Sequence, residues 1–226
     1  MHLFTSLRLL GSLSTLAIAL LLTACGSAPP TAPTATPAGS TGVHRFDGGS
    51  IDVSTRNGDC RLTLHGDIQS AAVRRMGSAF DSIEQAQCKR KTLVLDSGNG
   101  WLGDAITLGA MAHNRGYDTE VKAGSTCYTP CLLVFAAGQN RVLPDAPVPA
   151  RLGFSQIPPD QDFGRHQCNT ELTQGQHLTL TRYLKAMLPS NTATAVYQKL
   201  LAATCDRTDT YGPAEALALG LATATR

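Results

Sequence analysis

Strand-like runs alternate with segments of helical periodicity along the middle of the chain. The strand-like runs, rich in Val, Leu, Ile and Thr, lie at 43–55, 61–66, 91–96 and 119–123. Between the second and third runs, apolar residues recur at helical spacing, at Val73, Met76, Phe80 and Ile83. The run 91–96 is nearly continuous in apolar residues, which is typical of a central parallel strand. This order predicts an α/β fold, in which a mostly parallel central sheet of repeated βαβ units is flanked by helices.

Turn and cap residues mark the expected ends of these elements. Asp47-Gly48-Gly49 predicts a short N-terminal hairpin or an edge strand, and Ser70 is the expected N-cap of the first helix. The segment Leu102–Asn114 is apolar nearly all round, which predicts a second and largely buried helix. Gly116 lies where a helix C′ glycine is expected, because glycine accepts the left-handed backbone found there.

The chain beyond residue 140 is predicted to begin with short strands and to end in helices. The expected strands, on either side of a proline-rich turn, are Arg141–Leu143 and Arg151–Phe154. The expected helices are Leu172–Leu188, Thr192–Thr204 and Gly212–Leu221. Leu178, Tyr183 and Met187 are expected to form the apolar face of the first of these helices.

One stretch combines the end of a strand, a tight turn and the start of a helix. Cys127-Tyr128-Thr129-Pro130-Cys131 precedes an apolar run that predicts a helix over Leu132–Ala137. In α/β enzymes an elbow of this kind presents the nucleophile. The residue that this elbow would present is Thr129.

The N-terminal segment has the features of an export signal. Arg8 precedes a long apolar run, Leu9–Leu22, and the run ends in Leu22-Thr23-Ala24-Cys25. A basic start, an apolar core and small residues before a cut are typical of a secretory signal peptide, here residues 1–24. The alternative is a membrane-spanning helix, which needs a run of about 20 residues.

Leu-Thr-Ala-Cys also resembles a bacterial lipobox, which implies acylation of Cys25. Acyl chains would anchor the protein in a membrane, since each buried CH₂ contributes about 0.8 kcal/mol. In the lipoproteins that this segment resembles, the absence of Asp after the cysteine favours the outer membrane, and Gly26 stands there. The expected location is therefore the periplasmic face of the outer membrane. Residues 25–42, rich in Pro, Ala and Thr, are expected to be a flexible linker to one domain at 43–226.

Six cysteines remain once Cys25 is set aside. They are Cys60, Cys88, Cys127, Cys131, Cys168 and Cys205. An even number in an exported chain predicts three disulfides. Cys60 and Cys88 each precede a strand of one strand-helix-strand unit, so both are expected at the same edge of the sheet, where they could pair.

Two further pairs complete the expected set. Cys127–Cys131 would close a small loop and pin the elbow, and Cys168–Cys205 would flank the helical part of the chain. The alternative for Cys127 and Cys131 is zinc ligation. The x₃ spacing is unusual for zinc, however, and no His-x₃₋₅-His pair accompanies it.

Charge and motifs exclude some classes of function. The chain has 19 Lys and Arg against 17 Asp and Glu, a net charge of +2, which offers no electrostatic basis for binding nucleic acid. It contains no Gly-x₄-Gly-Lys-Ser/Thr motif, so no use of ATP is expected. Neither a cofactor nor a metal is expected.

The order of the motifs resembles a known superfamily. One strand ends in Gly66-Asp67, and a second ends in Leu95-Asp96-Ser97 before the turn Gly98-Asn99-Gly100. The elbow, Arg151-Leu152-Gly153-Phe154 and a terminal Glu-Ala-Leu-Ala-Leu-Gly-Leu follow. This order resembles the proteolytic subunit of Clp protease (ClpP) and the wider crotonase-like superfold, over about residues 62–223. It is most similar to exported Clp-protease-like proteins that carry Cys-x-Ser-x-Cys at the elbow.

The resemblance implies roles for particular positions. In such peptidases a serine at the elbow attacks the scissile carbonyl, a histidine on a later strand is the general base, and backbone N–H groups hold the oxyanion. Thr129 stands at the serine position and Ser155 at the histidine position. Gly98-Asn99-Gly100 and Pro130 stand at the positions that would bind the oxyanion.

Each departure from the pattern weakens this reaction. The β-methyl of Thr129 restricts χ1 and crowds the path of attack. Pro130 has no N–H, and the loss of one oxyanion donor can lower the rate about 10²–10³-fold. Ser155 cannot replace an imidazole, because its pKa lies far from neutral pH. An acidic third member has no clear match, although Asp206 and Asp209 lie nearest.

Histidines elsewhere and the single tryptophan remain as candidates for roles at the site. The histidines that could act as the base are His65, His113, His166 and His177. A lone histidine is more often structural or solvated. Trp101, beside the glycine turn, belongs either to the core or to a ligand-binding groove.

These observations predict a lipoprotein whose Clp-protease-like domain has lost its serine-peptidase machinery. Such a domain would bind a peptide, an acyl group or a partner protein in the former catalytic cleft. Two alternatives stay open. One is an active hydrolase that uses Thr129 as its nucleophile, and the other is a structural envelope protein that forms homo-oligomers.

Overall fold

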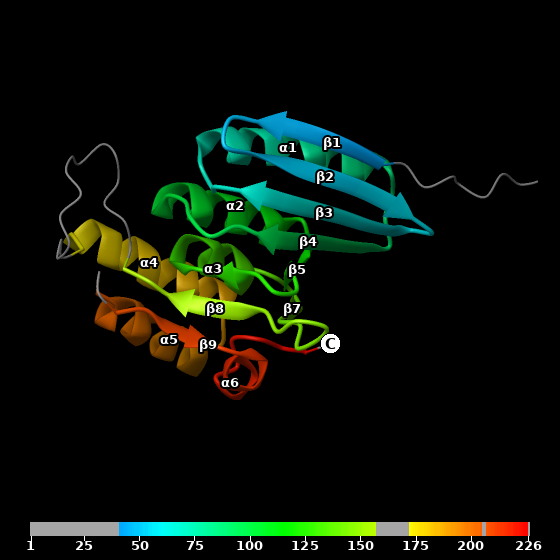
Figure 1. Cartoon of the computed structure of the whole chain (residues 1–226). Coiled ribbons are helices and arrows are strands. Elements are labelled where there is room, and N and C mark those ends of the chain that lie inside the picture. Colours follow the sequence, from blue (N-terminus) through cyan, green and yellow to red (C-terminus); the bar gives the residue numbers. More distant parts are fainter. Residues whose placement is uncertain (1–40, 157–171, 205–206, 226) are drawn as a thin grey trace, which may run out of the picture. The chain divides into compact units, whose positions relative to one another are not determined.

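Six strands form the main sheet of the molecule, in the order β1-β2-β3-β4-β5-β7 (Figure 1). They are β1 (Thr41–Phe46), β2 (Gly49–Arg56), β3 (Asp59–Gly66), β4 (Arg90–Asp96), β5 (Asp118–Val121) and β7 (Arg141–Val142). The first three strands pair antiparallel, and β3, β4, β5 and β7 pair parallel. The computed structural model describes residues 41–156, 172–204 and 207–225, which all belong to the compact unit Thr36–Arg226.

A smaller sheet and several helices complete the described part of the chain. The smaller sheet has the order β6-β8-β9, with β6 (Thr126–Cys127), β8 (Arg151–Phe154) and β9 (Asp209–Tyr211). The helices are α1 (Ser70–Gln85), α2 (Leu102–Asn114), α3 (Thr129–Ala136), α4 (Gln174–Met187), α5 (Ser190–Ala202) and α6 (Pro213–Ala218). In Figure 1, α1 and α2 lie against one face of the main sheet. Within the described ranges, every helix is too short or too polar to cross a membrane.

Leucines alternate along β3 and β4 and form an apolar stripe in the core. Leu62 lies opposite Leu93 and Leu64 lies opposite Leu95, and all four side chains are fully buried. Alternate residues of a strand point to opposite faces, so these leucines share the face on which the helices pack. Burying each of them stabilises the fold by about 1.5–3 kcal/mol. The stripe positions the carboxyl ends of β3 and β4, from which the chain turns toward the site.

The structure confirms the predicted α/β class and much of its layout. The hairpin β1-β2 and the unit β3-α1-β4 form as expected, and Gly116 has the positive φ of 69° that a C′ glycine adopts. The disulfide Cys60–Cys88 is also confirmed, with 5.8 Å between the two Cα atoms. It joins the start of β3 to the chain just before β4, because parallel neighbours begin at the same edge of the sheet.

Three details of the helices differ from the predictions. Gln69, not Ser70, is the N-cap of α1; the Ser70 hydroxyl instead donates to the Asp104 carboxylate of α2 at 3.1 Å. The helix α3 begins at Thr129, three residues before the predicted start, so the elbow residue is itself helical. Leu178 was expected on the apolar face of α4, but 49% of it is exposed. The buried residues of that face are Leu180, Tyr183 and Leu184, and Met187, as predicted, packs partly buried against the core.

Other differences concern the extent and burial of elements. The strand β9 was not predicted, and it pairs antiparallel with β8. The helix α2 has its predicted bounds but is only partly covered, since its buried positions are confined to one side. The first strand starts at Thr41, two residues before the predicted start of the domain.

Arg141 ties the C-terminal segment to the main sheet. Its side chain is 7% exposed. The guanidinium group donates to the backbone carbonyls of Leu221 at 2.7 Å, Gly138 at 3.1 Å and Gly220 at 3.3 Å. Burial lowers the pKa of Arg141 from its ordinary value. The three carbonyl groups stand in for water around a buried cation.

Candidate functional site

The elbow lies where two distant segments of the chain run side by side. The strand β6 ends at Cys127 and is parallel to β8, with Cys127 opposite Leu152. Tyr128 is the N-cap of α3, and Thr129 is its first residue. Because the two strands run in the same direction, Ser155, directly after β8, lies beside the start of α3.

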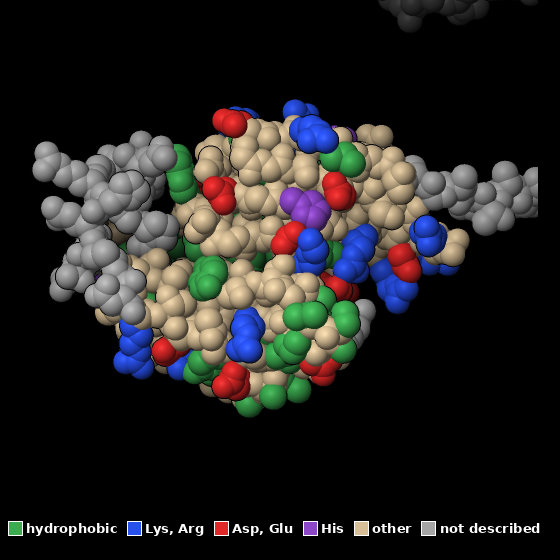
Figure 2. All heavy atoms as spheres, viewed as in Figure 1, with side chains coloured by type: hydrophobic (Ala, Val, Ile, Leu, Met, Phe, Trp, Pro, Cys, Tyr) green, Lys and Arg blue, Asp and Glu red, His purple; other side chains and the backbone are tan. Residues whose placement is uncertain are grey.

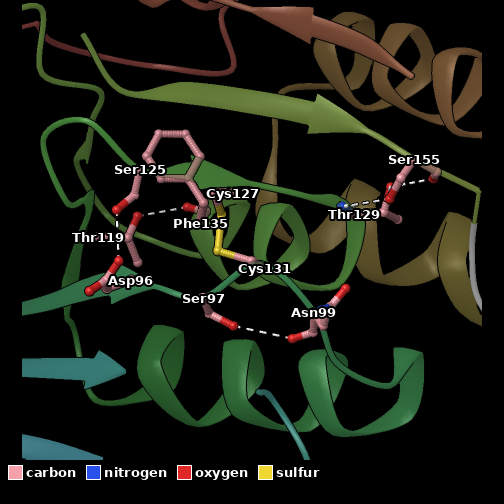
Figure 3. The surroundings of a disulfide bond; sticks show 10 residues. All are labelled: Asp96, Ser97, Asn99, Thr119, Ser125, Cys127, Thr129, Cys131, Phe135 and Ser155. Carbon is pink, nitrogen blue, oxygen red and sulfur yellow. Dashed lines mark hydrogen bonds between the residues drawn. A yellow bond between two sulfur atoms is a disulfide. The ribbon is translucent and has the colours of Figure 1, made fainter. Parts of the chain in front are cut away.

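Thr129 and Ser155 are joined by hydrogen bonds (Figure 3). The Thr129 hydroxyl donates to the backbone carbonyl of Ser155. The Ser155 hydroxyl in turn donates to Thr129 Oγ1 at 3.1 Å, and the Thr129 N–H donates to Ser155 Oγ at 3.3 Å. Thr129 is fully buried. The structure thus brings together the two positions that the family resemblance assigns to the nucleophile and the base.

The chemistry of this pair is that of a buried structural hydroxyl. In the described part of the chain, both hydrogen-bond partners of Thr129 Oγ1 belong to Ser155. A backbone carbonyl accepts a hydrogen bond but does not remove the proton, and a serine hydroxyl is too weak a base at neutral pH. The hydroxyl is therefore satisfied by hydrogen bonds, as buried polar groups usually are.

A disulfide closes the elbow around Thr129. Cys127 and Cys131 are bonded, with 5.2 Å between their Cα atoms, and both residues are buried (Figure 3). This pairing confirms the predicted disulfide and overturns the zinc alternative for these two cysteines. Pro130 takes the second position of α3, where the helix itself needs no N–H. A ligand at the helix start would nevertheless meet one N–H fewer.

The turn Gly98-Asn99-Gly100 is held to the segment between β3 and α1. The Asn99 carbonyl accepts from the N–H of Ile68 at 3.0 Å and from the Ser97 hydroxyl at 3.1 Å. Gly100 has a φ of 158°, and a Cβ there would lie 2.7 Å from the Ile68 side chain. Glycine is therefore required at Gly100 by close packing. In Figure 3, Asn99 of this turn lies on the side of the elbow where α3 begins at Thr129.

Tyr128 fills the space between this turn and β8. A Cβ added to Gly153 would lie 2.3 Å from Tyr128 Cδ1, well inside van der Waals contact. A Cβ added to Gly98 would lie 4.0 Å from Tyr128 Cδ2, at ordinary contact distance. The aromatic ring thus lies between the two glycines and is half-buried. It covers the side of the elbow that faces the glycine turn.

The side chains of His65, His113 and His177 make contacts away from Thr129. Their hydrogen-bond partners are Asp96 and Asp52 for His65, the Ala137 carbonyl for His113, and the Tyr197 hydroxyl for His177. Such contacts fit structural roles, and none of them reaches the hydroxyl of Thr129. His166, Asp206 and the predicted pair Cys168–Cys205 lie outside the described residues. Asp209 lies on β9 opposite Phe154 and pairs with Arg207 at 3.4 Å.

Asp96 is the centre of a polar cluster at the carboxyl end of β4. Its carboxylate accepts hydrogen bonds from Lys122 at 2.6 Å, Ser125 at 2.7 Å and His65 at 2.8 Å. Burial raises the pKa of Asp96, but the hydrogen bonds from these three side chains outweigh it and lower the pKa to about 2. In Figure 2 a histidine side chain lies among acidic and basic side chains on this face. Within the described ranges, no group of three or more His, Cys, Asp or Glu residues is arranged to hold a metal.

The Asp96 cluster predicts a loss of stability in acid. Because the folded pKa lies below the ordinary 3.8, the stabilisation is full above pH 4 and falls as the pH drops toward about 2. The side chain is 26% exposed, so we expect a loss of about 1–2 kcal/mol. Chemical unfolding at several pH values measures it. Asp96→Asn should remove this pH dependence, whereas Asp145→Asn, on an exposed loop, should preserve it; identical profiles for both would contradict the assignment.

Sequence reasoning did not identify Tyr128 or the Asp96 cluster as parts of the site region. No pattern in the sequence around Tyr128 indicates where its side chain lies. Its position depends on Gly98 and Gly153, which are far apart in the sequence. Asp96 was singled out only as part of the strand-end motif Leu95-Asp96-Ser97, at the carboxyl end of an apolar strand, where polar residues of parallel sheets gather.

Comparison with known proteins finds similarity in structure alone. The chain matches no model of a protein family, and no curated protein resembles it significantly in sequence. Among solved structures, the 1510-N membrane-bound stomatin-specific protease superposes with a TM-score of 0.55 at 14% identity, covering 73% of this chain and 77% of that one. The same protease in complex with a substrate peptide gives a TM-score of 0.52 at 12% identity, with 73% of each chain covered.

Other solved structures, a hydratase and a further peptidase, share the architecture. An enoyl-CoA hydratase from Mycobacterium marinum superposes with a TM-score of 0.53 at 10% identity, covering 78% of this chain and 76% of that one. A peptidase from Plasmodium falciparum gives 0.52 at 11% identity, covering 74% and 94%. At these identities the similarity shows the fold: the mixed α/β fold of Clp-protease-like and crotonase-like proteins, as the motif order predicted.

Proposed function

We propose that this chain is a lipoprotein whose Clp-protease-like domain binds an extended peptide or protein segment without cleaving it. The observation that carries the proposal is the state of Thr129. Its hydroxyl is buried and donates to the Ser155 carbonyl, so the elbow holds no activated nucleophile. Three features of catalysis are absent from this part of the structure: a strong base at Ser155, an N–H at Pro130, and an accessible hydroxyl.

Two observations favour a peptide as the ligand: a protein of similar structure, and the backbone groups near the elbow. A protease of this fold is known in complex with a substrate peptide, although the likeness to this chain is in fold alone. The glycine turn and Gly153 leave backbone groups close to the elbow, and backbone groups bind extended peptides through main-chain hydrogen bonds. The half-buried ring of Tyr128 would contact the ligand or move aside for it.

The location proposed for this function is the periplasmic face of the outer membrane. It rests on the lipobox-like Leu22-Thr23-Ala24-Cys25 and on the glycine at position 26. A lipid chain on Cys25 would hold the domain near the membrane through the segment 26–40. The disulfides Cys60–Cys88 and Cys127–Cys131 agree with an oxidising compartment.

A second candidate function, a structural homo-oligomer, draws on exposed leucines. Leu178 of α4, Leu201 of α5 and Leu217 of α6 are 49%, 40% and 45% exposed. One such residue on each C-terminal helix would suit an interface between copies. Light scattering of the full chain in detergent, compared with Leu178→Glu, tests this candidate: a mass that halves or falls further in the variant would support it.

Retention of peptides without cleavage is the expected result of a direct test. The full chain is incubated with a tryptic digest of casein and separated from free peptides by gel filtration. Mass spectrometry then identifies the retained peptides and any new ends. We expect retained peptides whose ends are all tryptic, because Thr129 cannot attack.

The same experiment distinguishes the alternatives. New non-tryptic ends that disappear in Thr129→Ala would establish an active hydrolase and overturn the proposal. Tyr128→Ala serves as the binding variant, because it alters the elbow surface and leaves Thr129 and Ser155 in place. If neither the parent chain nor Tyr128→Ala retains a peptide, the structural role is favoured instead.

A further inference from the structure

A cavity beside the β1–β2 turn is lined by two arginines, Arg74 and Arg75. The cavity has a volume of about 360 Å³ and is lined by Phe46, Asp47, Ala71, Arg74, Arg75 and Ser78. In the described part of the chain, no ion pair or hydrogen bond involves the guanidinium groups of Arg74 and Arg75. None of the lining residues belongs to the Thr129–Ser155 site, so this is a separate place in the fold.

The donors in this cavity suit a phosphate group. Arg74 and Arg75 each present a planar fork of N–H donors, which matches the oxygen atoms of phosphate. Ser78, one turn further along α1, adds a hydroxyl group at the cavity wall.

Two other residues of the cavity, Phe46 and Asp47, restrict the chemical class of ligand that it could bind. Phe46 is half-buried against the core and forms an apolar wall. Asp47 is exposed, with no ion-pair partner among the described residues, and its carboxylate can accept a hydrogen bond. A site that combines two guanidinium groups with one carboxylate favours a ligand that has both an anion and a hydrogen-bond donor. The cavity volume lies at the low end of the range for small-molecule sites, about 300–1,000 Å³.

We propose that this cavity binds a phosphate ester whose alcohol part carries an ammonium or hydroxyl group. Arg74 and Arg75 hold the phosphate, and Asp47 accepts from the ammonium or hydroxyl. Phosphoethanolamine and glycerol phosphate are the simplest ligands of this class. Either could come from a phospholipid headgroup or from a soluble phosphate ester, and the two sources share the same chemistry.

Calorimetric titration of the full chain in a non-ionic detergent tests the proposal. The probes are O-phosphoethanolamine, sn-glycerol 3-phosphate and inorganic phosphate. We expect dissociation constants of about 0.1–1 mM for the two esters, weaker binding of inorganic phosphate, and weaker binding of all three as NaCl is raised.

Matched variants distinguish binding in the cavity from a general effect of positive charge on the protein surface. Arg74→Gln/Arg75→Gln should weaken ester binding at least about tenfold, because it removes two charge-assisted contacts. Arg56→Gln/Arg182→Gln removes the same charge from exposed positions elsewhere and should change binding less than about twofold. Asp47→Asn should weaken the binding of phosphoethanolamine more than the binding of inorganic phosphate. All the altered side chains are exposed or line the cavity, and thermal unfolding checks that each variant is folded.

The source of the ligand follows from one further probe. Dihexanoyl phosphatidylethanolamine that binds at least about tenfold more tightly than O-phosphoethanolamine would identify a lipid headgroup, whereas equal affinities would identify a soluble ester. Equal loss of binding in both double variants would overturn the proposal. So would the absence of measurable binding of either ester at about 10 mM, a concentration well above the expected dissociation constants.

Discussion

Replacement of Arg141 by Met is expected to lower the free energy of unfolding by about 3–5 kcal/mol. The reason is the set of three backbone carbonyls that the guanidinium satisfies, those of Gly138, Gly220 and Leu221. Methionine fills a similar volume but donates no hydrogen bond, so three acceptors lose a buried partner. Leaving one such group unsatisfied costs about 1–3 kcal/mol. Urea unfolding followed by circular dichroism measures the change.

Two comparisons test whether the carbonyls are the cause. Arg61→Met removes an ion pair with Glu120 in which the arginine is 46% exposed, and it should cost about 1 kcal/mol or less. Arg141→Lys keeps the charge but lacks the fork of donors, and it should fall between the parent and Arg141→Met. A loss below about 1 kcal/mol for Arg141→Met would contradict the role given to these hydrogen bonds.

The substitution Gly153→Ala is expected to cost about 1–3 kcal/mol and to disturb the elbow. The added Cβ would lie 2.3 Å from Tyr128 Cδ1, so the ring or the strand β8 must move. If the ring moves, the half-buried tyrosine leaves the space between the two glycines. The near-ultraviolet circular dichroism signal of the tyrosine should then change along with the stability.

A double-mutant cycle assigns the effect to this one contact. In a chain that carries Tyr128→Ala, the Gly153→Ala change should cost less than about 0.5 kcal/mol, because the clash is gone. Gly98→Ala is the matched control, since its added Cβ would lie 4.0 Å from the ring, and it should be nearly neutral. Equal costs for Gly153→Ala with and without the tyrosine ring would show that Tyr128 does not occupy this space.

Local pattern was enough to predict most of the main sheet. The apolar runs that became β3 and β4 differ in character from the helical spacing of Met76, Phe80 and Ile83, so strand and helix could be told apart. The pairing Cys60–Cys88 followed from the geometry of parallel neighbours. Elements that depend on distant partners were missed. The strand β9 has three residues and exists because β8 pairs with it.

Motif order singled out two positions, Thr129 and Ser155, that the structure brings into contact. It could do so because it reflects the order of strands and turns, but it did not predict how the two side chains are hydrogen-bonded. The direction of their hydrogen bonds depends on side-chain packing, which sequence does not encode locally. Ser70 shows the same limit. Serine is a favoured N-cap residue, but the hydroxyl of Ser70 donates its hydrogen bond to the Asp104 carboxylate of another helix.

The central claim is that Thr129 is a structural residue rather than a nucleophile. Its most direct test is the intact mass of the full chain after treatment with a fluorophosphonate probe, which labels activated hydroxyl nucleophiles. We expect no mass increase in the parent chain, and an increase in a Thr129→Ser/Ser155→His variant if the fold still supports the reaction. A probe adduct on the parent chain that is absent from Thr129→Ala would contradict the claim and would establish a hydrolase.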